Sequence, residues 1–435
     1  MQFKINFTFL QKGTSLRKIE TIRKIRKTSI SVSYFSYKFA FRRFMKLHKN
    51  LTNAVLRALH RIFEENKYAD KVIEHILKEN PKWGGRDRRF IAETTYEIVR
   101  WYRLLDSCLD MKTGPSDFEK IFSVYCVMKG IAVDETIKEK LQSGQHIRKI
   151  RESIPDWMDE LGVQELGEGR WEKELNALNQ EAKVVLRTNT LKISRDELQK
   201  KLADEGVETG ILEFQIPGSA LVLAKRQNVF TTSSFKDGLF EVQDAASQLV
   251  APFLDVKEGM RVIDACAGAG GKTLHLSALM NNKGKIIAMD TEQWKSDELK
   301  KRARRAGASN IETRLIDSSK TIKRLANSAD RLLLDVPCSG IGVLRRNPDA
   351  KWKLSLEFIE KVKLLQQKIL SEYAVMMKKG GKIVYSTCSI FPAENEKQVE
   401  EFLSERKNEF ELVEQKTIYP GEGFDGFFMA KLLRK

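Results

Sequence analysis

Two cysteines in the C-terminal half of the chain are the residues best suited to nucleophilic chemistry. Cys338 and Cys388 each lie just after a short apolar run that predicts a β-strand. Loops at strand ends are where binding and catalytic residues concentrate. A thiolate is strongly nucleophilic and also leaves readily. We therefore expect these two thiols to act at one site.

A glycine-rich loop follows another predicted strand and precedes a predicted helix. Its candidate ligand contacts are Cys266, Ala267, Gly268, Ala269, Gly270, Gly271 and Lys272. The loop misses the phosphate-loop pattern at Cys266 and the dinucleotide pattern at Thr273, where each pattern needs a glycine. Asp290 ends the next predicted strand, near the offset at which an acid meets a ribose hydroxyl. Loop and acid together predict a nucleoside-containing cofactor such as S-adenosylmethionine.

A thiol beside a methyl donor suggests one particular reaction. Carbon 5 of a pyrimidine is a poor nucleophile, but addition of a thiolate at carbon 6 gives an enamine whose carbon 5 can attack a sulfonium methyl group. Asp335, at the end of the strand before Cys338, suits the N3 and N4 edge of the base. One cysteine would attack, and the other would assist release.

The elements that must position these residues alternate between strands and helices after Gly238. Strands are expected at residues 261–264, 285–290, 331–335 and 382–386, and a long helix at 356–379 ends at Gly380 and Gly381. This alternation predicts a parallel α/β sheet. Ligands of such sheets bind outside the carboxyl ends of the strands, where Asp264, Asp290 and Asp335 are expected.

Four regions are expected along the chain. Residues 1–44 form a basic extension with eleven Lys and Arg residues and one acid. We expect it to be disordered or the product of a wrongly chosen start, with an organellar transit peptide and an RNA-binding arm as alternatives. Residues 45–150 predict a helical domain, 151–235 a small α+β module, and 236–435 the catalytic domain. The basic residues of the helical domain fit either a solvated face or an RNA-contacting face.

The composition of the 435 residues excludes several classes of protein. No run approaches the roughly 18 apolar residues of a membrane helix. Five cysteines without a CxxC pair argue against a disulfide scaffold and structural zinc, and favour a reducing, cytoplasmic setting. Cys108 and Cys126 lie in apolar helical patterns and are expected in the core. A net charge of +17 favours a nucleic acid partner.

Together these motifs resemble one enzyme family. The matching stretches are residues 241–248, the glycine loop, 335–340, 345–349 and 386–389. They resemble the bacterial ribosomal RNA (cytosine-5)-methyltransferases of the Fmu/Sun type, which are related to the NOL/NOP/Sun enzymes. The resemblance implies a Rossmann-like methyltransferase fold that uses S-adenosylmethionine, and a NusB-like RNA-binding domain at 45–150.

The resemblance also implies a role for each candidate residue. Cys388 would be the attacking nucleophile and Cys338 would aid product release, whereas DNA cytosine methyltransferases attack with the Pro-Cys cysteine. Residues 266–272 would bind the methionine part of the cofactor, Asp290 the ribose and Asp317 the adenine, and Asp335 would face both cofactor and target base. One departure is Gly268-Ala269, where many members have Ala-Pro.

Two other functions remain open at this point. An NAD-dependent oxidoreductase would also use a glycine loop, although the dinucleotide pattern is incomplete. An RNA-binding ribosome assembly factor with vestigial catalysis would keep the basic charge and not need Cys388. We expect RNA, most of all ribosomal RNA, as the partner, with no metal and no membrane; a monomer is favoured, but the oligomeric state is left open. Four cations near the Pro-Cys loop, Arg345, Arg346, Lys351 and Lys353, could hold phosphates, and Trp352 could stack on a base.

Overall fold

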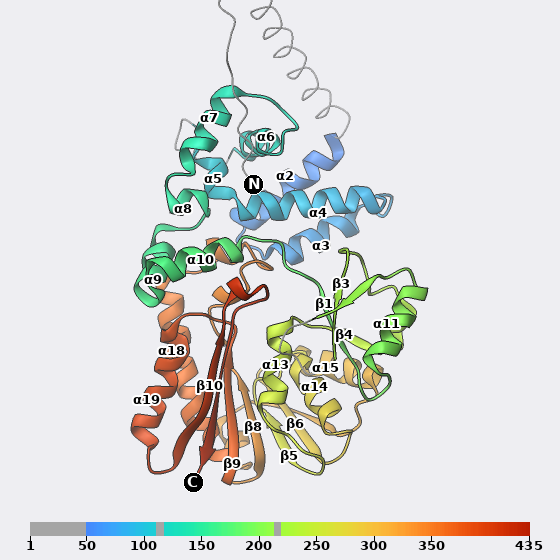
Figure 1. Ribbon diagram of the computed structural model, residues 1–435, viewed down its shortest axis with the longest axis vertical. Coiled ribbons are helices and arrows are strands. Elements are labelled where there is room, and N and C mark those ends of the chain that lie inside the picture. Colours follow the sequence, from blue (N-terminus) through green and yellow to red (C-terminus); the bar gives the residue numbers. More distant parts are fainter. Residues whose placement is uncertain (1–48, 110–116, 213–218) are drawn as a thin grey trace, which may run out of the picture. The chain divides into compact units, whose positions relative to one another are not determined.

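The computed structural model describes residues 49–109, 117–212 and 219–435 (Figure 1). The basic extension 1–44 lies outside these residues. The chain divides into two compact units, Met1–Ser153 and Ile154–Lys435. Among the described residues, no helix is both long and apolar enough to span a bilayer.

The described part of the first unit is helical, as the sequence predicts. Its helices are α2 (Lys49–Phe63), α3 (Ala69–Glu79), α4 (Gly85–Arg100), α5 (Tyr102–Asp106), α6 (Phe118–Met128), α7 (Glu135–Gly144) and α8 (Arg148–Arg151). Helix α2 buries Val55, Leu59 and Ile62, which recur at helical spacing, and packs against α3, α4 and α6. Both cysteines expected in the core, Cys108 and Cys126, are buried here.

The second unit opens with two helices and a small antiparallel sheet. Helices α9 (Asp156–Leu166) and α10 (Glu168–Leu178) precede strands β1 (Val185–Thr188), β2 (Thr209–Ile211), β3 (Ala220–Leu223) and β4 (Phe240–Val242). The sheet order is β2-β3-β1-β4, and α11 (Arg195–Asp204) and α12 (Ser233–Lys236) accompany it. Ser194 caps α11 in a capping box with Glu197, which explains why that helix begins there.

The remainder of the second unit is a seven-stranded sheet in the order β10-β11-β9-β8-β5-β6-β7, with helices on both faces (Figure 1). Its strands are β5 (Arg261–Asp264), β6 (Lys285–Asp290), β7 (Ile311–Leu315), β8 (Ala329–Asp335), β9 (Met377–Thr387), β10 (Phe410–Ile418) and β11 (Phe427–Arg434). Strands β5 to β9 pair in parallel, and β11 pairs antiparallel with β9 and β10. The order reverses between β5 and β8, which is where open α/β sheets bind ligands.

Alternate residues of the central strands fill two cores. Val262 and Leu333 face a cluster with α13 (Ala245–Phe253) and α14 (Gly271–Leu279), whereas Ile263 and Leu332 face a cluster with α18 (Leu356–Tyr373) and α19 (Glu396–Arg406). The other helices are α15 (Gln293–Ala306), α16 (Ser319–Lys323) and α17 (Ala350–Lys353), and the 3₁₀ turns are η1 (Ile341–Val343), η2 (Ala374–Met376), η3 (Pro392–Glu394) and η4 (Pro420–Glu422). Burial on both faces explains why the central strands are almost uniformly apolar.

One element boundary differs from the sequence prediction. The long helix expected to reach Lys379 ends at Tyr373, and β9 already begins at Met377. Met377 is buried and pairs with Ala329, after which the register shifts to Arg331 opposite Lys382. Residues from Met377 onward therefore pair in the sheet and do not extend the helix. Gly380, with φ of +75°, lies in the bulge at the register shift and does not end a helix.

A matched pair of glycines tests the packing of α9 on α10. A Cβ at Gly162 would lie 2.1 Å from the ring of the fully buried Trp171, whereas a Cβ at Gly169 of α10 would meet nothing within 4 Å. We expect Gly162→Ala to destabilise the protein by about 1–3 kcal/mol through overpacking. Gly169→Ala should be neutral or slightly stabilising, because alanine favours helices. Thermal unfolding of both variants measures the difference, and equal melting temperatures would contradict this packing.

Candidate active site

The two cysteine loops meet at the carboxyl ends of β8 and β9. The Sγ atoms of Cys338 and Cys388 lie 3.1 Å apart as free thiols, and the amide of Cys388 donates to Cys338 Sγ at 3.3 Å. The neighbouring Cys388 thiol, burial and the charge of Glu394 raise the pKa of Cys338 well above its ordinary value. The structure thus brings the two predicted thiols into contact and disfavours a thiolate at Cys338.

Main-chain bonds lock the Cys388 loop in place. The amide of Gly342, in η1, donates to the carbonyl of Cys388 at 3.0 Å, and the carbonyl of Gly342 accepts from the amide of Gly426 at 2.8 Å. A Cβ at Gly342 would lie 2.4 Å from the Gly426 oxygen and 2.7 Å from the Cys388 oxygen. Only glycine fits where these three segments cross.

An ion pair joins the glycine loop to the strand that leads to Cys338. Lys272 Nζ lies 2.6 Å from Asp335 Oδ2, and Ser386 donates its hydroxyl to Asp335 Oδ1 at 3.0 Å. Lys272 Nζ also lies 5.1 Å from the centre of the Phe427 ring. The structure therefore brings Lys272, Asp335 and the start of the Cys388 loop together.

The glycine loop and Asp290 are also linked directly. Asp290 Oδ2 accepts from the amide of Gly268 at 3.0 Å, and Asp290 Oδ1 accepts from Lys295 Nζ at 3.1 Å and the amide of Glu292 at 3.0 Å. Gly270 has φ of +90°, and a Cβ there would lie 2.6 Å from Leu299 Cγ. A Cβ at Gly268 would meet nothing within 4 Å.

Asp317 follows β7, two strands away from β5. It is exposed, and its carboxylate accepts from the hydroxyls of Thr321 at 2.5 Å and Ser318 at 3.1 Å, which lower its pKa. The amide of Ile316 donates to the carbonyl of Asp290 at 2.9 Å, so the β6 and β7 ends are joined. Asp317 is thus at the same edge of the sheet as Asp290.

Two arginines that the sequence analysis missed support the glycine loop from behind. Arg187 of β1, which is buried, donates to the Gly271 carbonyl at 2.6 Å and to the side chain of Gln243. Burial lowers the pKa of Arg187 to about 10. Arg302 donates to the Ala269 carbonyl at 2.8 Å and to Glu241 at 2.9 Å. No local pattern marks either arginine, because their partners are distant in sequence.

The cations near the Pro-Cys loop have internal partners. Arg346 lies 2.6 Å from Asp244 and also pairs with Asp425, and Arg345 donates to the Pro420 carbonyl at 2.8 Å. Lys351 is 1% exposed and donates to the side chain of Asn179 at 2.6 Å, and Lys353 pairs with Asp349 at 2.9 Å. These cations therefore bind other parts of the protein, and their charges stabilise the segment that follows the Pro-Cys loop. Trp352 is partly buried.

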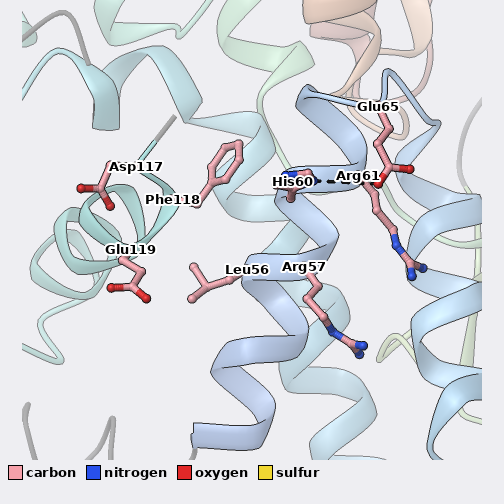
Figure 2. Close-up of a pocket in the computed structure, with 8 residues that line it drawn as sticks. All are labelled: Leu56, Arg57, His60, Arg61, Glu65, Asp117, Phe118 and Glu119. Carbon is pink, nitrogen blue, oxygen red and sulfur yellow. Dashed lines mark ion pairs between the residues drawn. The ribbon is translucent and has the colours of Figure 1, made fainter. Parts of the chain in front are cut away.

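A pocket of about 440 Å³ lies elsewhere, in the helical unit (Figure 2). Its lining residues are Leu56, Arg57, His60, Arg61, Glu65, Asp117, Phe118 and Glu119. Arg57 and Arg61 pair with Glu79 at 2.7 and 3.2 Å, so their charges are compensated by a carboxylate. The pocket contains none of the predicted site residues. In the described residues, no group of three or more metal-ligating side chains gathers.

Comparison with known proteins identifies the family. Residues 251–433 match the model described as "16S rRNA methyltransferase RsmB/F", and residues 154–230 match "Methyltr_RsmF/B-like, ferredoxin-like domain". A probable ribosomal RNA small subunit methyltransferase B of Synechocystis is 31% identical, over 88% of this chain and 98% of its own length. The chain belongs to the RsmB/F family of ribosomal RNA small-subunit methyltransferases.

Solved structures agree with this membership. The crystal structure of PH0851 superposes with a TM-score of 0.72 at 25% identity, over 87% of this chain and 97% of that one. The structure of NSun6 from Pyrococcus horikoshii with SFG has a TM-score of 0.59 at 22% identity, over 65% of this chain and 99% of that one, which is a likeness of fold. The predicted resemblance and the predicted Rossmann-like fold class are both confirmed.

The buried Asp264 of this RsmB/F chain should make stability depend on pH in an unusual direction. Burial raises the pKa of Asp264 to about 7, and Thr273 donates to its Oδ2 at 2.7 Å. Between about pH 4 and 7 the folded state then binds more protons at this group than the unfolded state, so its contribution to stability falls as pH rises. We expect the free energy of unfolding of the wild type, minus that of Asp264→Asn, to decrease across this range and level off above it.

Asp255→Asn is the matched control. Asp255 pairs with Lys382 at 2.8 Å and Lys431 at 3.2 Å, and these cations lower its pKa. Its contribution is complete above the unfolded pKa and is lost as pH falls below about 4. Denaturant titrations at several pH values should give opposite slopes for the two variants. Parallel curves would contradict the burial of Asp264.

Proposed function

We propose that this chain transfers a methyl group from S-adenosylmethionine to carbon 5 of a cytosine in RNA, most of all small-subunit ribosomal RNA, through a covalent bond between Cys388 and the base. The observation that carries the proposal is the 3.1 Å contact between Cys338 and Cys388, on the sheet edge that also holds the glycine loop. The Lys272–Asp335 ion pair of 2.6 Å supports it by linking that loop to the thiols.

The residues at this edge fit an adenosyl cofactor. Residues 266–272 would hold the methionine part, Asp290 the ribose and Asp317 the adenine. The carboxylate of Asp290 has about four acceptor positions, and the three bonds described above leave room for a hydroxyl. When bound, S-adenosylmethionine supplies an electrophilic methyl group. Lys272 and Asp335 keep the loop and the β8 end at a fixed separation.

The chemical steps divide between the two thiols. A base takes the proton of the Cys388 thiol, and the sulfur adds to carbon 6 of the cytosine. Asp335 would accept from the N4 amino group and share the proton that N3 takes up. Carbon 5 then takes the methyl group from the sulfonium, which leaves as S-adenosylhomocysteine. N3 gives back its proton, a base removes the proton from carbon 5, and the bond to Cys388 breaks to release a thiolate. Cys338, held as a thiol by its raised pKa, can donate an S–H hydrogen bond to that departing thiolate.

The proposed chemistry also limits which RNA can be the substrate. A base must leave its stack to reach two thiols at a sheet edge, so the substrate is single-stranded or distorted at the target. The net charge of +17 favours such a polyanion. We assign residues 236–435 to catalysis and the regions 45–150 and 151–235 to RNA binding.

The proposal is tested by incubating the protein with labelled S-adenosylmethionine and total ribosomal RNA, followed by bisulfite sequencing. We expect label in small-subunit RNA and a new protected cytosine. Label on another base or position would overturn the cytosine-5 chemistry. Folded protein that binds S-adenosylhomocysteine but incorporates no label, and whose cellular role survives Cys388→Ala, would instead identify an assembly factor.

The two cysteine variants should fail at different steps. We expect Cys388→Ala to abolish turnover and form no adduct, because it lacks the nucleophile. Cys338→Ala should accumulate a covalent protein–RNA complex on denaturing gels, since release is impaired. Cys126→Ala, a buried thiol of the helical unit, is the control and should retain activity. The reverse pattern would assign the attack to Cys338.

Asp290 should contribute to cofactor affinity. A hydrogen bond to a charged group contributes about 1.5–3 kcal/mol, so Asp290→Asn should weaken S-adenosylhomocysteine binding roughly ten- to hundredfold by calorimetry. Asp297→Asn, on the exposed face of α15, removes a similar charge and should leave affinity unchanged. Stabilisation by NADH in place of S-adenosylhomocysteine would favour an oxidoreductase.

A further inference from the structure

Glu394 is a buried carboxylate for which the mechanism above has no use. It lies at the end of η3, six residues after Cys388, and its exposed fraction is 0%. Within the described residues no ion pair joins it to a lysine or arginine. Burying an uncompensated charge is costly unless hydrogen bonds satisfy it. The burial of Glu394 without a cationic partner therefore needs an explanation.

Four hydrogen bonds reach the carboxylate, from three residues. Glu394 Oε1 accepts from the hydroxyls of Ser339 and Ser389, each at 2.5 Å. Glu394 Oε2 accepts from the amide of Ser339 at 2.7 Å and from Gln366 Nε2 at 3.1 Å. A carboxylate has about four acceptor positions, so these four bonds satisfy it. Ser339 directly follows Cys338, and Ser389 directly follows Cys388.

Further contacts extend this bridge on both sides. Gln366 of α18 also donates to the carbonyl of Pro337 at 2.9 Å, so Cys338 is held from the residues before and after it. The Glu394 carbonyl accepts from the hydroxyl of Tyr385 at 2.7 Å, which ties η3 to the end of β9. The two cysteine loops are thus joined through the side chain of Glu394.

We propose that Glu394 is a positioning residue that sets the separation of the Cys338 and Cys388 sulfurs by holding the serine after each. The role rests on the proposed function, in which the two thiols act on one base. The carboxylate bonds to neither sulfur, so it acts through the serines. Its charge adds a second effect, because it raises the pKa of Cys338 and keeps that thiol protonated.

The test compares Glu394→Gln with Glu174→Gln. Glu174 is equally buried and accepts from the amide of Gly421 at 2.6 Å, but it does not touch the cysteine loops. We expect Glu394→Gln to keep its cofactor affinity while its kcat falls roughly ten- to hundredfold, the size of loss that a small misplacement causes. Glu174→Gln should keep kcat. Equal kcat in the two variants would overturn the proposal.

A second measurement does not need methyl transfer. In a Cys388→Ala background, the rate of Cys338 alkylation by iodoacetamide is followed against pH by peptide mass spectrometry. Adding Glu394→Gln should move the alkylation profile to lower pH, because the negative charge beside Cys338 is gone. An unchanged profile overturns the influence of Glu394 on Cys338, whereas absent methyl transfer with a shifted profile counts only against the proposed function.

Ser389→Ala separates position from charge and keeps the test decisive if Glu394→Gln does not fold. This change removes one bond of the bridge and leaves the carboxylate in place. We expect kcat to fall while the alkylation profile of Cys338, measured with Cys388→Ala, stays at its original pH. Unchanged kcat in Ser389→Ala would show that the bridge does not position the thiols.

Discussion

The parallel pairing of β8 with β9 is the constraint on which the site depends. In this register Asp335 stands opposite Ser386, and the amide of Val336 donates to the Ser386 carbonyl at 3.0 Å. Cys338 and Cys388 then follow within three residues of that pair, so their loops leave the sheet side by side. A slip of one residue would turn the side chains of one strand to the opposite face of the sheet. The apolar cores on both faces of the sheet fix this register. The packing of the cores therefore determines where the two cysteine loops lie.

The segments before the seven-stranded sheet take part in this geometry as well. Trp171 and the apolar residues of α9 and α10 form one cluster with Ile341, Ile390 and Phe391, which lie beside the two cysteine loops. Arg187, from the small antiparallel sheet, holds the carbonyl of Gly271. These contacts make the module at 154–230 a support for the rim of the large sheet, in addition to any part it has in RNA binding.

The sequence was sufficient to predict the α/β class, the strand at Lys285–Asp290 and the meeting of the cysteine loops, because each follows from local periodicity and from the rule for strand ends. It was insufficient for the end of α18, where sheet pairing overrides helix propensity. It was also insufficient for Glu394 and Arg187, because a buried polar side chain is defined by partners that only folding brings close. Arg345 and Arg346 illustrate the same limit, since their carbonyl and carboxylate partners are far away in sequence.

The crossing at Gly342 has a consequence for the energetics of turnover. Three segments share main-chain bonds there, with no side chain between them, so the backbone around Cys388 is fixed before any substrate arrives. Ordering a flexible loop would otherwise cost about 1–2 kcal/mol per residue at the moment of reaction. Here the entropic cost falls on folding, so in the proposed reaction the energy of RNA binding remains available to move a base out of its stack.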